Sequence, residues 1–463
     1  MRSLLIKNAL CCLLLLVSLV RSQDSKTTSI THATVIDVAT GQELKDQTVV
    51  IQDGRITSVS ATTSDPAPSG KIIDAHGGFL IPGLLDMHVH IQDLADLPLY
   101  IANGVVGVRM MSGEKDTKSR REELASAPLS PEVIVGSAIV DGDPPVWPGS
   151  IIVRSPDDAR RVVDSIKAGG ADFVKVYNGV PRDAYFALAD EAKKQDISFV
   201  GHLPFGVTAQ EASDAGQRSI EHLDGIAFGC SKKEKQLTRD RQDAPHYVAR
   251  MNVEADAYRS FDAAQCTALF QQFRRNGTWQ VPTLTVNRSM GMLDDRRFTS
   301  DARLVYMNER VRYRWQPEND ERFRRWRPEF FQLKRSLFSA DERLVGLMFK
   351  AGVPLMAGTD AMNPFCFPGF SLHDEMALLV ESGLTPLAAL QAATLNPSVF
   401  LGRTSDIGTI APGKRADLVL LDADPLADIH NTTHIQAVWL KGEYFDRAAL
   451  DQMLDNAKHR KRR

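Results

Sequence analysis

Short apolar runs of strand length alternate with longer amphipathic runs through the middle of the chain. The amphipathic runs carry helical periodicity and capping residues, such as Ser155 before a predicted helix that stops at Gly169. This alternation is typical of βα units around a parallel sheet. The predicted strands lie at residues 80–90, 105–110, 133–140, 173–177, 198–203, 219–223, 280–285 and 353–360. Because eight parallel strands close a barrel, we predict an α/β fold, a (β/α)8 TIM barrel.

The two ends of the chain have a different residue pattern from the middle. Residues 30–73 consist of short β-branched runs broken by turn residues, including Asp53 and Gly54. The same pattern returns at residues 417–422 and 435–441, where Lys441 and Gly442 resemble a hairpin tip. We therefore expect both ends to build one small β-sandwich. The predicted division is a signal peptide at 1–22, β-sandwich segments at 23–79 and 405–447, a (β/α)8 barrel at 80–404, and a C-terminal helix with a basic tail at 448–463.

One connection is much longer than a βα crossover needs. Residues 286–338, between the seventh and eighth predicted strands, interleave arginines with aspartates and glutamates. A solvated, salt-bridged helical insertion is one interpretation. The other is a lid that contacts substrate, because the segment follows the carboxyl end of a strand, where barrels place their chemistry.

The first residues predict export. Arg2 and Lys7 precede a nearly continuous apolar run at residues 9–20, and Ser22 offers a small residue for cleavage. A membrane anchor is the alternative, but the apolar run is shorter than the ~20 residues that span a bilayer. We expect a periplasmic or extracellular protein without stable membrane insertion. Of its cysteines, Cys230, Cys266 and Cys366 would remain after cleavage, enough for one bridge at most.

Composition excludes several other classes. Hydrophobic residues make up 43% and charged residues 24% of the 463, as in ordinary globular proteins, so a disordered or multi-span membrane chain is excluded. Lys and Arg total 55 against 58 Asp and Glu. With no excess of positive charge to neutralise phosphates, nucleic acid is not an expected partner. Composition does not exclude a small-molecule or short-peptide partner, and a homo-oligomer is compatible with the sequence.

Ionisable residues gather at the ends of five predicted strands. His88 and His90 are two residues apart in the first strand, so both side chains project to one side and can share a cation. The others are Lys175, His202, His222 and Asp360, at the fourth, fifth, sixth and eighth strands. Because the carboxyl ends of barrel strands meet at one face, we expect these side chains to converge there.

The most specific motifs in this arrangement are PGLLDMHVH at residues 82–90, SIEH at 219–222, GTD at 358–360 and GTIAPGKRADLV at 408–419. On these motifs the sequence resembles the amidohydrolase superfamily, particularly its imidazolonepropionase-like and prolidase-like branch, over nearly all of the chain after the signal. The resemblance implies two divalent metal ions, most often zinc. It assigns His88, His90 and Asp360 to one ion, His202 and His222 to the other, and a carboxylated Lys175 as the bridging ligand. Asp360 would also act as general base and then general acid.

Substrate contacts are less well defined, because the chain departs from the prolidase-like pattern. DGDPPVW at residues 141–147 stands where relatives carry a Gly-Gly-His-Gly stretch, and no tyrosine follows His202 closely. Tyr177, on the same face as Lys175, is a candidate substitute for that tyrosine, although strand-end tyrosines often only pack. Trp147 is a candidate for stacking on substrate or for surface packing. His373 is a candidate pocket residue, with packing or capping as the alternative.

These features together predict a binuclear metal-dependent hydrolase that cleaves an amide C–N bond in a dipeptide, an N-acyl amino acid or a cyclic amide by metal-activated hydroxide. A lactonase or phosphotriesterase on the same site is the first alternative, because metal-activated hydroxide attacks carbonyl and phosphoryl centres alike. A noncatalytic metal-binding or ligand-binding barrel protein is the second, since a fold alone does not establish activity.

Overall fold

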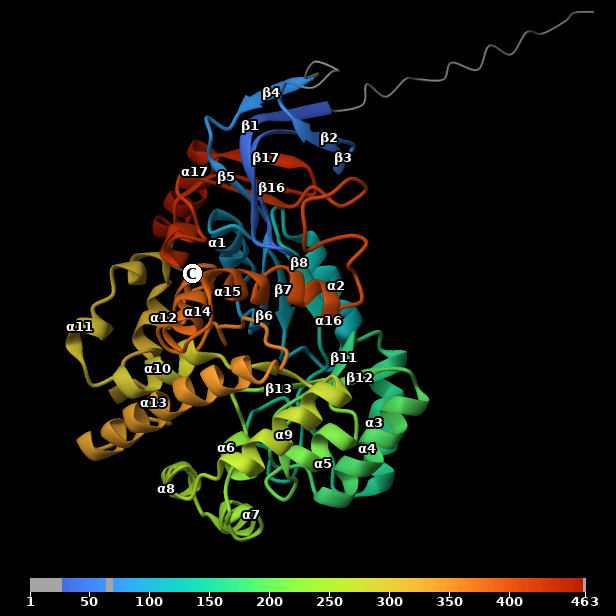
Figure 1. Ribbon diagram of the computed structural model, residues 1–463. Coiled ribbons are helices and arrows are strands. Elements are labelled where there is room, and N and C mark those ends of the chain that lie inside the picture. The colour runs from blue at the N-terminus through green and yellow to red at the C-terminus, as the bar shows by residue number, and fades with distance from the viewer. Residues whose placement is uncertain (1–26, 64–69, 461–463) are drawn as a thin grey trace, which may run out of the picture.

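The two ends of the chain meet in one sheet. The computed structural model describes residues 27–63 and 70–460; the predicted signal peptide and the last three residues of the basic tail lie outside them. Figure 1 shows the blue strands of the first residues beside the red strands of the last ones. The eight strands are β1 (Thr27–Asp37), β2 (Gln42–Gln52), β3 (Arg55–Ala61), β4 (Lys71–Asp74), β5 (Phe79–Pro82), β15 (Leu418–Leu421), β16 (Ile435–Leu440) and β17 (Glu443–Asp446). The pairing order is β17-β16-β15-β5-β1-β2-β3, with β4 on β1.

This sheet folds back on itself. The hairpin tips at Gly54 and Gly442, with φ of +80° and +83°, approach so closely that a Cβ on Gly442 would lie 2.5 Å from the Cα of Gly54. Only glycine combines left-handed backbone with such an approach. The apolar side chains inside the fold, among them Ile30, Val49 and Trp439, form a separate small core. The terminal sheet is therefore a closed unit with its own interior.

Parallel strands form the centre of the molecule. One sheet pairs β6 (Leu84–Val89), β7 (Val105–Met110) and β8 (Glu132–Val135). The other pairs, in the order β10-β9-β11-β12-β13-β14, the strands β9 (Val140–Asp141), β10 (Ile151–Ile152), β11 (Phe173–Val176), β12 (Ser198–Gly201), β13 (Ser219–Glu221) and β14 (Trp279–Val281). Isolated parallel bridges join Gly136 to Phe173, Gln280 to Leu355 and Val89 to Ala361. The α/β class predicted from the sequence is confirmed.

Four predicted strands differ in the structure. Residues 133–140 are divided between β8 and β9, which lie in different sheets, and of residues 280–285 only 280 and 281 are strand, because a helix begins at Leu284. The other two are the first and the last predicted strands. The first, at residues 80–90, is divided at Gly83: β5 joins the terminal sheet and β6 the central one. A Cβ on Gly83 would meet the Val106 side chain at 2.4 Å, so the chain changes sheets where a side chain cannot fit. The last, at residues 353–360, pairs only through Leu355 and otherwise has no regular ladder. Its backbone instead bonds to β6, where Asp360 N donates to the His88 carbonyl at 2.8 Å. Ala357 N of the same segment donates to the Ala392 carbonyl.

The helices outside the long insertion pack around the parallel strands, on one another or, for α17, against α1 and the terminal sheet. They are α1 (Leu97–Ala102), α2 (Thr117–Ser126), α3 (Pro156–Ala168), α4 (Arg182–Lys194), α5 (Ala209–Asp214), α6 (Ile226–Gly229), α7 (Glu234–Asp243), α8 (Tyr247–Arg259), α9 (Ala263–Asn276), α14 (Phe370–Glu381), α15 (Pro386–Ala392), α16 (Leu395–Phe400) and α17 (Arg447–Lys458). Helix α3 begins as the sequence predicts, because the Ser155 hydroxyl accepts from Asp158 N and Pro156 occupies the first turn. Within the described ranges no helix is long and apolar enough to cross a membrane.

The long insertion packs on the core through an apolar cluster. It contains α10 (Leu284–Met292), α11 (Arg296–Thr299), α12 (Glu309–Arg314) and the first part of α13 (Pro328–Lys350), which lie together at one side in Figure 1. Trp315 and Phe323 of the insertion join Phe365 and Phe367, which follow the last predicted strand. The segment is therefore more than a solvated, salt-bridged surface. Its predicted end at residue 338 falls within α13, because the insertion and the crossover share one continuous helix.

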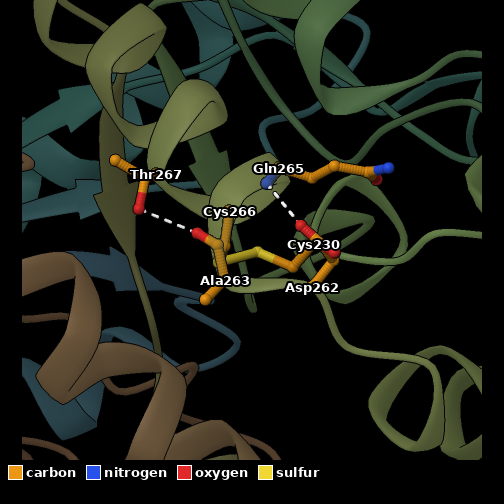
Figure 2. Close-up of a disulfide and its surroundings, with 6 residues drawn as sticks. All are labelled: Cys230, Asp262, Ala263, Gln265, Cys266 and Thr267. Carbon is orange, nitrogen blue, oxygen red and sulfur yellow. Dashed lines mark hydrogen bonds between the residues drawn. A yellow bond between two sulfur atoms is a disulfide. The ribbon is translucent and has the colours of Figure 1, made fainter.

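Cys230 and Cys266 form a disulfide, whereas Cys366 is free and buried. Figure 2 shows the bridge beside the first turn of α9, where the Asp262 carboxylate accepts from Gln265 N at 2.9 Å. The bridge thus joins the end of α6 to a well-capped helix 36 residues further along the chain.

Reduction of this disulfide is expected to lower the free energy of unfolding by about 4 kcal/mol, because the bridge closes a loop of roughly 37 residues in the unfolded chain. Urea unfolding of oxidised and reduced protein measures the difference. A C230S/C266S variant serves as the control. Its free energy of unfolding should equal that of the reduced protein and should not change when reductant is added. Equal stability of oxidised and reduced protein would contradict the expectation.

Candidate active site

The end of β6 brings two histidines to one aspartate. Nε2 of His90 lies 2.8 Å and Nε2 of His88 3.4 Å from Oδ1 of Asp360. Asp360 is held there by its backbone, which bonds to the His88 carbonyl, while His90 N donates to the Ala361 carbonyl. The alternation of side chains along the strand thus places both imidazoles on the side of Asp360, as the spacing predicts.

Three further side chains reach the same place from neighbouring strands. The ring of His222, which follows β13, has its centroid 4.6 Å from that of His88 and 4.7 Å from that of His202, which follows β12. Nδ1 of His222 lies 3.9 Å from Oδ2 of Asp360. Lys175 of β11 is fully buried, and its charge contributes to lowering the pKa values of His88, His202 and His222. The structure therefore gathers all six side chains that the strand ends predict.

This donor set fits a divalent cation. One ligand atom from each of His88, His222 and Asp360 lies within 4.8 Å of the others. Among the residues described, Nε2 of His88 and Nζ of Lys175 are buried without a hydrogen-bond partner. Buried polar atoms of native proteins are nearly always paired, so these atoms indicate a missing partner. The three-residue group combines members of both predicted ligand sets, and the division between two ions stays a prediction.

The ionisation of these groups also suits a metal. Burial lowers the pKa of His88 to about 3, with a further contribution from Lys175, so the imidazole is neutral. Burial alone would raise the pKa of Asp360, but His222, His88 and His90 together hold it below its usual value. Burial lowers the pKa of Lys175 to about 8, which increases the fraction of its amine that is neutral. Neutral imidazoles and an ionised carboxylate are the forms that bind divalent metals.

An ion pair behind the histidines fixes His88. Oε2 of Glu221 lies 2.8 Å from His88 Nδ1, and Arg109 donates to Glu221, to the Ser219 hydroxyl and to the Met87 carbonyl. Arg109 and Glu221 are both fully buried. A carboxylate on the second nitrogen of a ligand histidine sets its tautomer and orientation.

Sequence reasoning missed this pair. In a regular strand, the side chains of Glu221 and His222 would point to opposite faces of the sheet. His222 has a φ of +61°, which ends the strand, so both side chains can reach the site. The available signal was Arg109 itself, a charged residue inside the apolar run of β7. The other histidines also have partners: His222 Nδ1 lies 2.6 Å from the Thr283 hydroxyl, and His202 Nδ1 lies 3.6 Å from Asp224.

The E221Q variant is expected to lose about 3–5 kcal/mol of unfolding free energy, because the amide leaves the buried Arg109 charge uncompensated. Urea unfolding measures the loss. The matched control is E211Q, which removes the partner of Arg182 in a pair whose side chains are 49% and 35% exposed. This control should lose less than about 1 kcal/mol. Similar losses in both variants would show that the buried pair has no special role.

The candidate substrate residues separate into two groups. Nε1 of Trp147 donates to the Tyr177 hydroxyl at 2.9 Å, and the Tyr177 ring lies 4.1 Å from that of His202. Tyr177 therefore adjoins the histidine cluster, and Trp147 adjoins Tyr177. His373 does not adjoin that cluster: its Nε2 donates to the Asn103 carbonyl at 3.0 Å and its Nδ1 lies 2.9 Å from the Thr432 hydroxyl. Its two nitrogens are engaged inside the protein, which corrects the pocket assignment in favour of packing.

Fold and site together define a class: an α/β protein with parallel strands whose ends converge on a histidine and aspartate cluster suited to metal. Comparisons with known proteins support a family assignment. The family model described as "Amidohydrolase family" matches residues 332–444. The imidazolonepropionase of Geobacillus kaustophilus is 36% identical over 99 residues, 20% of this chain and 23% of that protein. That of Mycolicibacterium smegmatis is 25% identical over 409 residues, 85% of this chain and 89% of that protein.

A solved structure is similar over a greater length. Bottromycin amidohydrolase superposes with a TM-score of 0.74 at 28% identity, covering 93% of this chain and 91% of that one. The family model, these relatives and this structure support the amidohydrolase superfamily, in agreement with the resemblance drawn from the motifs.

Proposed function

We propose that this protein is a metal-dependent hydrolase that cleaves an amide C–N bond. The observation that carries the proposal is the convergence of His88, His222 and Asp360 within ligand distance, beside a buried lysine amine. The similarity to bottromycin amidohydrolase and to imidazolonepropionases supports hydrolysis as the reaction. A dipeptide, an N-acyl amino acid or a cyclic amide is the proposed substrate.

A closed (β/α)8 barrel over residues 80–404 is the proposed frame. The parallel bridge of Gly136 to Phe173 joins the two central sheets on one side, and those of Gln280 and Val89 join them through the segment that follows α13; all three support it. In a closed barrel the strand ends that carry the histidines face a common centre.

We propose two divalent ions, most simply zinc, as cofactors. His88, His90 and Asp360 would hold one, His202 and His222 the other, and a carboxylated Lys175 would bridge them. The buried, unpartnered Nζ of Lys175 and its lowered pKa support carboxylation, since only a neutral amine adds carbon dioxide. Bound ions of this kind polarise a carbonyl and lower the pKa of a water molecule.

The protein's own residues supply proton transfer and orientation. Asp360, ionised and next to His90, accepts a proton from the water that attacks the amide carbon and returns it to the leaving nitrogen as the C–N bond breaks. The products are a carboxylic acid and an amine. Glu221 and Arg109 keep His88 oriented throughout, while Trp147 and Tyr177 form one wall beside His202.

A substrate panel tests the proposal. Zinc-loaded protein is assayed with N-acyl amino acids, dipeptides and cyclic amides on one side, and lactones and phosphotriesters on the other. Release of amine from at least one amide, abolished by chelation and restored by zinc, is the expected result. Turnover of lactones or phosphotriesters alone would overturn the amide assignment, and no turnover at full metal occupancy would favour a binding protein.

We further propose that the protein is exported, with cleavage after Ser22. The Cys230–Cys266 disulfide supports this, because structural disulfides persist in oxidising compartments. N-terminal sequencing of protein recovered from the periplasmic or culture fraction tests the cleavage site. An intact Met1 in that fraction would contradict it.

A further inference from the structure

An arginine of the insertion contacts the loop that follows β6. Arg314, the last residue of α12, donates from Nη2 to Oε1 of Gln92 at 2.8 Å. Gln92 lies two residues beyond His90, so this contact holds the end of α12 beside the strand end that carries two candidate metal ligands.

A second arginine of the insertion contacts the segment that follows Asp360. Arg322 donates from Nη1 to Oδ1 of Asn363 at 2.8 Å, and Asn363 Nδ2 donates to the Asp360 carbonyl at 3.0 Å. Asp320 accepts from Nε and Nη2 of Arg322 at 3.0 and 2.7 Å, which fixes the plane of the guanidinium. One N–H on each terminal nitrogen remains available, and the side chain is 34% exposed.

A third contact places Arg322 above the wall of the site. Its guanidinium carbon lies 5.6 Å from the centre of the Trp147 ring, whose N–H reaches Tyr177 and through it His202. Two insertion arginines thus contact three separate loops, those of Gln92, Trp147 and Asn363, which follow or adjoin residues of the histidine cluster.

The charges at this mouth are not balanced. Among the described residues, Asp320 is the only carboxylate within ion-pair distance of Arg322, and none lies that close to Arg314. Burial, followed by the charge of Arg310, lowers the pKa of Arg314; the Asp320 carboxylate partly opposes this shift, and the charge of Arg322 adds to it. Adjacent guanidinium groups that repel one another are stabilised when an anion lies between them.

We propose that Arg314 and Arg322 bind the carboxylate of a substrate whose scissile amide lies at the histidine cluster. A guanidinium pairs with a carboxylate through two parallel hydrogen bonds, and it is the side chain best suited to such an anion. The inference rests on the proposed hydrolase function and narrows it: the substrate is an N-acyl amino acid or a dipeptide with a free carboxylate, not a neutral cyclic amide.

The test compares one substrate with its amide. The N-acyl amino acid or dipeptide cleaved fastest in the panel above is assayed beside its C-terminal carboxamide, with wild type, R314Q and R322Q. Wild type should prefer the free acid on the order of 10-fold or more, and each variant should raise the KM for the acid by about 10-fold while changing the KM for the carboxamide much less. R314K, which keeps the charge, should recover part of the loss.

Controls separate recognition from folding of the insertion. R312Q changes an exposed arginine of the same helix and should behave like wild type. Binding is also measured by calorimetry in the D360N background, where N-acetylleucine should bind more tightly than its amide and R314Q should remove the difference. Three outcomes would overturn this inference while the hydrolase assignment stands. They are equal turnover of acid and carboxamide by the wild type, equal losses on both substrates in the variants, and cleavage of cyclic amides alone. Failure to cleave any amide would instead overturn the proposed function.

Discussion

Replacement of Lys175 by alanine is expected to lower kcat/KM by more than about 100-fold, the upper range for residues that only orient metal ligands. The reason is the position of Nζ, which is buried without a partner next to the histidine cluster. If the amine carries a carboxylate group, the variant lacks both of its oxygens. Metal content should fall below two ions per chain, and added acetate or propionate should restore part of the activity by entering the space left behind.

Two measurements accompany the Lys175 variant. K167A, at an exposed position in α3, serves as the control and should retain wild-type metal content and activity. Removing carbon dioxide during metal loading should lower the activity of the wild type and leave K175A unchanged. A fully active K175A, with two metals bound, would exclude the bridging role.

The D360N variant is expected to lower turnover by about 100-fold or more, because an amide cannot accept the proton that the carboxylate takes from water. Asparagine keeps an oxygen that can face the His90 and His88 nitrogens, so much of the metal should remain bound. Metal analysis beside steady-state kinetics separates lost chemistry from lost ligand.

The matched control for this variant is D143N. Asp143 is a half-exposed carboxylate in the loop after β9, paired with Arg154 at 2.8 Å, and it does not touch the histidine cluster. Turnover of D143N should equal that of the wild type. Near-normal turnover of D360N with metal in place would assign proton transfer to another group.

The strand ends were the most predictable part of the site. His88 and His90 share a side because strand side chains alternate, a local rule that holds in β6. The approach of Asp360 followed from barrel topology rather than from local pattern, and the structure brings it there through backbone bonds to β6 instead of a regular strand. A one-sequence pattern does not reveal such an irregular segment, because its apolar residues look like those of a strand.

What the sequence could not reveal was the layer behind the ligands. Glu221 reaches His88 only because the backbone at His222 leaves the strand conformation. The pattern of apolar and polar residues along the sequence does not predict a left-handed residue at that position. The apolar interior of the insertion was also missed, since Trp315 and Phe323 are separated by charged residues and gather only after folding. For His373 the sequence left a pocket role open beside packing. Its hydrogen-bond partners, Asn103 and Thr432, are distant in sequence, so the local pattern could not show that both of its nitrogens are engaged inside the protein.

The pairing of β5 with β15 has a consequence for biosynthesis. Only Gly83 separates β5 from β6, the strand that carries His88, and β15 is made more than three hundred residues later. Until the ribosome releases the last strands, β5 lacks one of its two neighbours and the start of β6 is not anchored. We therefore expect ions to be acquired only after synthesis is complete, and a chain truncated before residue 418 to be recovered without them.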